Sequence, residues 1–538
     1  MLFNSLEFLV FFAVVFPLYC AFSRRWQNHM LLLASYVFYG WAEPKFVILM
    51  ALTTLVDFFV GMRIEDAPTP AAGKRWLTAS IVLNLTLLGT FKYLGFLSEN
   101  LDALCQWLRP GSHCDLIGFL AERVPALYRV MTTQNAEGVL KLAVPAGISF
   151  YTFHEISYVT DIYRKHIKAA RKFEDFAVFI SFFPQLVAGP IGRASWQMPQ
   201  FQHPRKMTYE GWSEGLALFV TGMFRKVVVA DPLGALAKHV FDHPERFGRG
   251  ALLIGLYCFA FQIYADFAGY SDMARGLARF MGFGLIQNFE HPYFATNITE
   301  FWRRWHISLS SWLRDYLYIP LGGNRKGTLR TYVNLFLTMF LGGLWHGASW
   351  NYAVWGSLHG IYLAAHKWIM SRRASPSDDV RVPLVGTPTS ASRDATGANI
   401  SRALPTQPSE NTGRSTYQWH PIAFLKAFAT FHLVALTWIF FASKTFAQSS
   451  AFLKGLFLHH AKVAGVKAMI LNKDELNAAG AGLLLMLLLV DIPQYRSKDH
   501  YAMLRWPFGW RVAGFLTLVL ATILTRGAEH VPFIYFKF

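Results

Sequence analysis

The sequence predicts an all-α polytopic membrane protein with about eleven transmembrane helices and additional re-entrant or interfacial helices. Of its 538 residues, 53% are hydrophobic and only 16% are charged, whereas a soluble protein carries about 25% charge. Many apolar runs approach the ~20 residues that a membrane-spanning helix needs. Several runs are broken by Gly or Pro, which is tolerated at membrane depth only where backbone is buried in protein or lines a wet cavity such as a funnel. Candidate spans lie at 6–22, 29–42, 46–62, 77–97, 138–158, 174–191, 211–235, 250–280, 331–349, 350–370, 421–441, 475–493 and 508–526.

The distribution of charge gives a partial topology. The net charge of +18 indicates basic cytoplasmic loops beside anionic membrane lipid, and no nucleic-acid-binding motif is present. The run 6–22 has no basic residue before it and is followed by Arg24 and Arg25. This order is the reverse of a cleaved signal peptide, so we expect a first membrane helix with its N-terminus outside. The basic stretch 164–172 is expected inside, which leaves 98–137 outside.

The four cysteines show neither a metal nor a redox motif. Cys105 and Cys114 share the loop expected outside, where an oxidising compartment permits a disulfide; a reduced pair is almost as compatible with the sequence. Cys20 and Cys258 lie in apolar runs and are expected to be packing residues. No HExxH motif or Cys/His cluster indicates a metal, and no metal site is predicted.

One segment differs in composition from the rest. Residues 371–420 are rich in Ser, Thr, Pro, Ala and Gly, with few aromatic residues, which predicts a disordered, cytoplasmic linker. It separates a membrane core, 1–370, from C-terminal membrane helices, 421–538.

The stretch 290–329, "EHPYFATNITEFWRRWHISLSSWLRDYLYIPLGGNRKGTL", is too polar to span a membrane and too aromatic for a free loop. Tryptophans interleaved with arginines are typical of an amphipathic helix at the membrane interface. Arg303 and Arg304 can hold phosphate from lipid or from a cofactor, or can simply anchor the helix to headgroups. His306 lies within this segment.

A second histidine, His346, ends an apolar run in "GGLWHGASW". It lies about 15 residues beyond Thr331, or ~22 Å along a helix. An ionisable residue at such depth is a functional-site hypothesis, and imidazole is suited to take a proton near neutral pH. The alternative is a packed, hydrogen-bonded neutral histidine.

Other polar residues within apolar runs are weaker candidates. Asp266, in "FQIYADFAGYSD", can orient a histidine or an arginine, or form a buried ion pair. Tyr270 lies one helical turn further on the same face. Asn351, after the second histidine motif, is a candidate substrate ligand. His154 and Glu155 lie in mid-span with no role that the sequence specifies.

The motifs "FFPQLVAGPIGR", "YADFAGYSDMARG", "FWRRWHISLSSWLRDYLYIPLGGNRKG" and "GGLWHGASWNYAVWGSLHG", with "VPAGISFYTFHEISYVTDIYR" and the opening "MLFNSLEFLVFF", resemble the membrane-bound O-acyltransferase family. They are most similar to its bacterial alginate O-acetyltransferase branch. The resemblance covers 1–370 nearly continuously and 421–447 more loosely. Ala442 departs from the branch, which commonly has an arginine after "TWIFF".

This resemblance implies a ring of tilted helices around a central funnel, with His346 as the essential catalytic residue and His306 assisting it. It implies transfer of an acetyl group from cytosolic acetyl-CoA, with no bound cofactor, to hydroxyls of a cell-surface or exported polysaccharide such as alginate. The expected setting is the bacterial inner membrane with its lipid, and the expected partner is a periplasmic acetyl-handling protein of SGNH type. The alternatives are a proton-coupled transporter, although no inverted repeat is evident, and a non-catalytic scaffold for polysaccharide synthesis.

Overall fold

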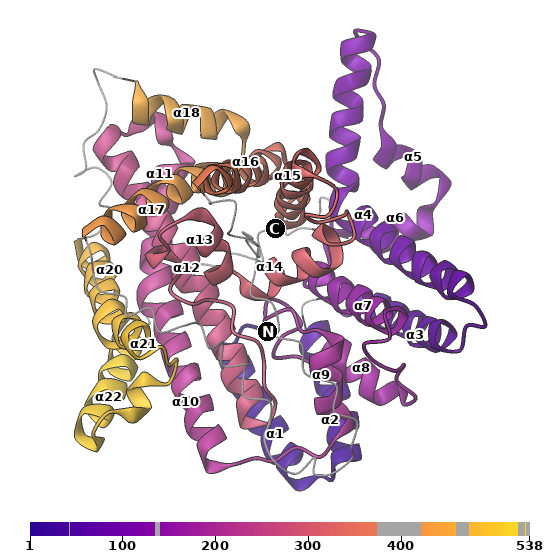
Figure 1. Cartoon of the computed structure of the whole chain (residues 1–538), viewed down its shortest axis with the longest axis horizontal. Helices are drawn as coiled ribbons and strands as arrows, with labels where there is room; N and C mark the ends of the chain where they lie inside the picture. The colour runs from indigo at the N-terminus through magenta and orange to yellow at the C-terminus, as the bar shows by residue number, and fades with distance from the viewer. Residues whose placement is uncertain (42, 135–139, 374–420, 459–472, 526–532, 534–538) are drawn as a thin grey trace.

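The computed structural model describes the chain except for residues 42, 135–139, 374–420, 459–472, 526–532 and 534–538. The described chain is helical apart from a two-stranded hairpin, so the prediction of an all-α polytopic membrane protein is confirmed. Figure 1 shows short helices α13 and α14 in the middle of the molecule, α3 to α7 on one side and α20 to α22 on the opposite side. The predicted linker 371–420 lies outside the described residues from 374 onward.

The N-terminal half contains long helices, such as α3 and α4, together with several short ones and a two-stranded antiparallel sheet. The antiparallel strands pair Thr132 with Leu142 and Gln134 with Leu140. The elements are α1 Leu6–Ala21, α2 Arg24–Gly40, α3 Lys45–Glu65, α4 Pro70–Leu108, α5 Leu116–Arg123, α6 Pro125–Met131, β1 Thr132–Gln134, β2 Leu140–Leu142, α7 Ile148–Tyr163, α8 Phe173–Ser181, α9 Ala194–Gln202, α10 Tyr209–Phe224, η1 Arg225–Ala230 and α11 Asp231–Asp242.

The second half holds the histidine motifs and the C-terminal helices. Three elements of the described chain are π-helical: η1 in the first half, and η4 and η5 in the second. A π-helical turn is wider than an α-helical one and occurs often at functional sites. The remaining elements are η2 Pro244–Arg246, α12 Arg249–Phe280, η3 Pro292–Phe294, α13 Ile298–Arg304, α14 Ile307–Leu313, η4 Arg314–Tyr318, α15 Thr328–His346, α16 Trp350–Arg373, α17 Pro421–Ala442, α18 Phe446–Phe457, α20 Lys473–Leu485, η5 Met486–Asp491, α21 Ile492–Ser497, η6 Ala502–Arg505 and α22 Phe508–Thr525.

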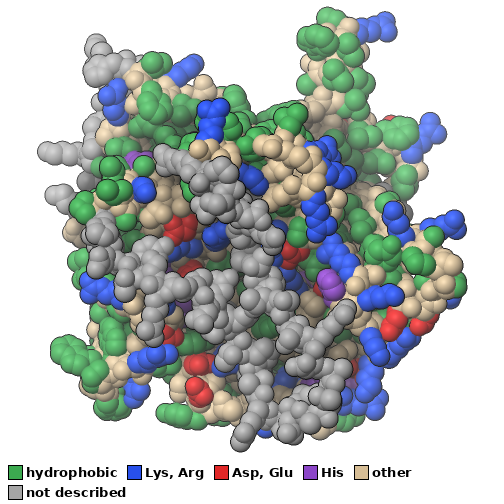
Figure 2. Space-filling model, viewed as in Figure 1, with side chains coloured by type: hydrophobic (Ala, Val, Ile, Leu, Met, Phe, Trp, Pro, Cys, Tyr) green, Lys and Arg blue, Asp and Glu red, His purple; other side chains and the backbone are tan. Residues whose placement is uncertain are grey.

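Six helical stretches in the described chain are long and apolar enough to cross a membrane. The rim of the molecule carries large groups of hydrophobic side chains, as Figure 2 shows, and α22 exposes 61% of Ile523 and 83% of Leu524. Such apolar surface fits contact with lipid. The total of about eleven crossings stays a prediction. The six stretches are Lys45–Glu65, Pro70–Leu108, Arg249–Phe280, Pro421–Ala442, Ala479–Ser497 and Phe508–Thr525.

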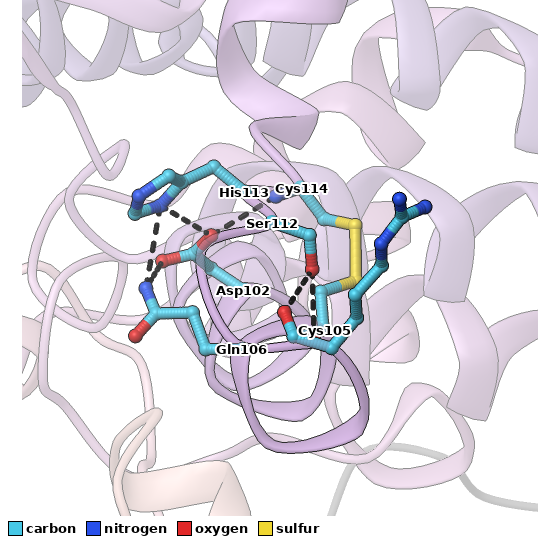
Figure 3. The surroundings of a disulfide bond; sticks show 7 residues. Asp102, Cys105, Gln106, Ser112, His113 and Cys114 are labelled. Atoms are coloured by element: carbon cyan, nitrogen blue, oxygen red, sulfur yellow. Dashed lines mark hydrogen bonds and ion pairs between the residues drawn. A yellow bond between two sulfur atoms is a disulfide. The ribbon is translucent and has the colours of Figure 1, made fainter.

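Helix α4 is longer than a bilayer requires. Its 39 residues span ~58 Å at 1.5 Å per residue, against a hydrocarbon core of about 30 Å. At its far end the structure joins Cys105 and Cys114 in a disulfide. Asp102 braces this turn, since it accepts hydrogen bonds from the Cys114 backbone N–H at 2.9 Å and the Gln106 amide at 2.7 Å (Figure 3).

The expected span 138–158 is wrong in its first half, because α7 begins only at Ile148. Gly147 ends the preceding loop with φ of +75°, a left-handed conformation that glycine adopts without strain. A side chain here would collide with the backbone of Leu186. The buried helix therefore starts where the chain passes close to another backbone segment.

The expected span 174–191 is also wrong as a complete helix, since α8 ends at Ser181. Pro184 disfavours helical geometry at the residue before it. The irregular backbone that follows is buried, and side chains satisfy its N–H groups: Ser35 accepts from Phe183, Ser308 from Ile191, and His154 from Gly192, at 2.9–3.1 Å. This agrees with the rule that irregular backbone at membrane depth must be buried in protein and paired.

The stretch 290–329 is not one interfacial helix, as expected, but four short helical pieces. Its tryptophans Trp302, Trp305 and Trp312 are at most 6% exposed. The indole N–H of Trp312 donates to the Phe153 carbonyl at 3.1 Å. Because the rings pack inward and find protein partners, the part of this segment that carries the tryptophans lies inside the core, whereas 324–329 is exposed.

Candidate active site

His346 is the last residue of α15 and is 4% exposed. The helices α15 and α16 approach closely at Gly343 and Gly356, where an added methyl group would meet the opposite backbone. This hairpin brings the Trp355 ring to 5.1 Å from the imidazole, between ring centroids, and α17 contributes Phe441 at 5.2 Å. The histidine is thus held in an aromatic enclosure.

His306 lies between α13 and α14, and its side chain is fully buried. Its ring centroid is 6.5 Å from that of His346 and 4.6 Å from that of Phe267. Burial lowers the pKa of His306 to about 3, so the imidazole is neutral at neutral pH. Its φ of +44° is rare for a residue with a side chain, and such conformations concentrate at functional sites. The structure thus brings together the two histidines that the sequence singled out.

Two residues near the site were missed by sequence analysis. The Lys92 ammonium donates to the Trp345 carbonyl at 2.5 Å, and the Tyr93 hydroxyl donates to the Leu344 carbonyl at 2.8 Å. A cation at the C-terminus of a helix stabilises the unpaired carbonyls there. Both residues lie on α4, about 250 positions earlier in the chain, so no local pattern could have signalled them.

A small cavity of about 30 Å³ lies between α13, α14, η4, α15 and α16. Arg314, Thr338 and Met339 are among its lining residues. Thr338 precedes His346 by eight residues on α15, or ~12 Å along the helix axis. Neither His306 nor His346 lines this cavity, so it lies apart from the histidine pair.

Asp266 and Tyr270 both lie on α12, and their contacts are with residues other than the two histidines. The Asp266 carboxylate, 1% exposed, contacts the Lys226 ammonium at 2.9 Å, and Asp231 contacts the same ammonium at 2.7 Å. Tyr270 stacks on Phe3 with ring centroids 4.6 Å apart. Asp266 therefore takes part in a buried ion pair, the alternative that the sequence had left open.

The remaining candidates, Arg303, Arg304 and Asn351, contact other parts of the protein. Arg304 forms an ion pair with Glu300 at 2.6 Å. Arg303 is half-buried, and its charge lies near His366. The Asn351 amide donates to the Ser443 carbonyl at 2.9 Å and accepts from the Ser449 hydroxyl at 3.2 Å. Its amide thus links α16 to the residue that follows α17 and to α18. Within the described part of the chain, no group of three or more His, Cys, Asp or Glu side chains is placed to hold a metal ion.

Fold and site together define a polytopic helical membrane protein with two buried histidines facing each other in its core. The sequence model of the membrane-bound O-acyltransferase family matches residues 31–388, and the chain belongs to this family.

The chain is similar to curated proteins whose names describe acyl transfer to cell-surface polymers. The probable alginate O-acetylase of Pseudomonas aeruginosa is 43% identical over 373 residues, covering 68% of this chain and 66% of that protein. The peptidoglycan O-acetyltransferase of Helicobacter pylori is 36% identical over 372 residues, covering 64% of each chain. A teichoic acid D-alanyltransferase of Streptococcus thermophilus is 28% identical over 290 residues, covering 51% of this chain and 68% of that protein. The chain thus spans slightly less than two thirds of the length of the first two relatives.

Proposed function

We propose that this protein is a membrane-embedded O-acyltransferase that moves an acetyl group from cytosolic acetyl-CoA to hydroxyls of a cell-surface or exported polysaccharide of alginate type. The observation that carries the proposal is the buried pair His306 and His346, with ring centroids 6.5 Å apart inside an aromatic enclosure. Family membership and the acetyltransferase names of two relatives support the reaction class.

In this proposal His346 is the general base. Its imidazole takes the proton of the acceptor hydroxyl while the oxygen attacks the thioester carbonyl. The carbon–sulfur bond then breaks, the ester bond remains, and the proton passes from the imidazolium to the departing thiolate. His306 polarises or positions the thioester. Exclusion of water by the aromatic rings protects the thioester from hydrolysis.

Deletion of the gene tests the reaction. O-acetyl esters of the surface polysaccharides should be lost in the deletion strain, as measured by mass spectrometry of the isolated glycans, and should return with the intact gene. Proton-coupled flux through the purified protein without covalent acyl transfer would instead support a transporter. An unchanged ester content across all surface polymers would contradict the proposal.

We further propose that the protein lies in the bacterial inner membrane, with its N-terminus and the Cys105–Cys114 turn in the periplasm beside an SGNH-type acetyl-handling partner. In intact cells expressing a Cys20→Ser variant, a membrane-impermeant maleimide should label the two cysteines only after reduction. Cys258 is buried and should stay unlabelled. Labelling that requires cell lysis would place this turn in the cytoplasm and reverse the topology.

A further inference from the structure

Two buried indole N–H groups beside His346 have no acceptor in the part of the chain that the structure describes. Trp345 is 5% exposed and Trp355 is 1% exposed, and neither indole N–H donates a hydrogen bond to a described residue. The large majority of buried polar side-chain atoms in native proteins are paired, and an exception calls for an explanation. A buried donor without an acceptor also costs folding free energy. Folding alone therefore does not account for these two groups.

Both rings contact the imidazole of His346. The centroid of the Trp345 ring lies 5.0 Å from that of His346, with the ring planes at 76°, and the centroid of Trp355 lies 5.1 Å away, with the planes at 90°. Trp345 precedes His346 on α15, whereas Trp355 comes from α16. The N–H of Trp438 is also unpaired, but its ring stacks on Trp355, with centroids 5.7 Å apart. The imidazole is thus flanked by two rings that each carry an unpaired donor.

The polar side chain that lies next to Trp355 on α16 is already saturated. The imidazole of His359 is 4.8 Å from Trp355 between ring centroids. Its Nδ1 accepts from the indole N–H of Trp302 at 3.3 Å, so the ring proton is on Nε2, 2.9 Å from the Thr437 hydroxyl oxygen. That hydroxyl in turn donates to the Val434 carbonyl at 2.7 Å. Neither nitrogen of His359 can therefore accept from Trp355.

The groups around Trp345 also lack an acceptor for its N–H. Apart from the two histidines, its ring contacts Phe150 and Phe153 of α7, with centroids 5.5 and 5.3 Å away, and the Lys92 ammonium at 5.7 Å. An ammonium is a donor only, and the phenyl rings carry no lone pair. A bound molecule with a carbonyl or anionic oxygen can supply the acceptor that these neighbours lack.

We propose that the indole N–H groups of Trp345 and Trp355 are catalytic donors to the carbonyl oxygen of the acyl thioester, an inference that rests on the acyl transfer proposed above. When the acceptor hydroxyl oxygen attacks the carbonyl carbon, an electron pair of the C=O bond moves onto this oxygen, and the two indoles stabilise the oxyanion. The C=O bond re-forms as the carbon–sulfur bond breaks, and the electron pair of that bond leaves with the thiolate. Donors that are fixed in the folded protein need little reorganisation during the reaction.

Replacing each tryptophan with 3-benzothienylalanine tests the N–H alone, because sulfur takes its place in a ring of nearly the same shape. Membranes that hold equal amounts of each full-length variant receive radiolabelled acetyl-CoA, and the label in surface polysaccharide is measured against the acetyl-CoA concentration. Each replacement should lower the apparent kcat by about 10²–10³-fold, the usual effect of losing one oxyanion donor, with the KM for acetyl-CoA almost unchanged. Because neither N–H has an acceptor among the described residues, the Tm of the purified variants should not fall.

Trp312 provides the matched control. Its ring is also buried, but its N–H donates to the Phe153 carbonyl at 3.1 Å. The same replacement there should lower the Tm and leave the apparent kcat of the folded protein unchanged. An unchanged kcat at both Trp345 and Trp355 would overturn the proposal, and so would a loss of activity at these positions that is matched by a fall in Tm. Absence of label with the folded wild type would instead contradict the acyl transfer itself.

Discussion

Replacing His346 with alanine should reduce O-acetylation of the surface polysaccharide by about 10²–10⁴-fold, the usual contribution of a general base. The imidazole is the only group in our proposal that accepts the hydroxyl proton, and Trp355 and Phe441 pack beside it. Ester-linked acetate released by alkali from the surface polymers of cells expressing each variant measures the effect.

Matched substitutions separate catalysis from folding. His346→Gln preserves much of the side-chain volume and can hydrogen-bond, but it cannot act as a base, so it should be as inactive as His346→Ala. His243→Ala removes a histidine whose side chain is 47% exposed and should leave acetylation unchanged. Each variant is compared at equal membrane abundance and equal elution volume in detergent. Substantial acetylation by His346→Gln would show that this residue is not the base.

Local sequence patterns were sufficient to nominate the histidines but not to build their surroundings. The apolar run before His346 and the Gly and Trp residues around it gave both the helix and its unusual end. The support of that end by Lys92 and Tyr93, and the ring of Phe441 beside it, depend on segments about 250 and 95 positions away. Such contacts are created by packing, which leaves no period in the sequence.

The fold shows the same division. Hydrophobic length predicted the six stretches that can span a membrane, because length and apolarity are set within one segment. It failed for 138–158 and 174–191, where Gly147 and Pro184 mark irregular backbone that only distant side chains can satisfy. The alternation of tryptophan and arginine in 290–329 wrongly predicted a helix at the membrane surface, since composition does not distinguish an interfacial aromatic ring from a buried one.

Replacing Arg225 with glutamine should lower the free energy of unfolding by about 3–5 kcal/mol, the usual effect of breaking a buried ion pair from one side. Arg225, in the π-helical η1, is 2% exposed and contacts two carboxylates, Asp272 on α12 and Asp491 at the end of η5. Its loss leaves Asp491 with no cationic partner at comparable distance among the described residues. Thermal unfolding of the purified protein in detergent, followed by tryptophan fluorescence, measures the change.

An exposed arginine provides the matched control. Arg171 is 56% exposed and pairs with Glu65 and Asp66, and its hydrogen bond holds the pKa of Asp66 below its ordinary value. Because water screens such pairs, Arg171→Gln should leave the Tm almost unchanged.

The pair Arg225 and Asp491 joins residues 266 positions apart, one in the membrane core and one in the C-terminal helices. If the loss in Arg225→Gln comes from an uncompensated carboxylate, Asp491→Asn in the same chain should restore part of the stability, since the double variant buries one charge fewer. A double-mutant cycle gives this coupling directly. Strictly additive losses would mean that the two residues stabilise their own helices independently. A positive coupling would instead show that Arg225 and Asp491 stabilise the protein jointly, through an ion pair that links the segments 1–370 and 421–538.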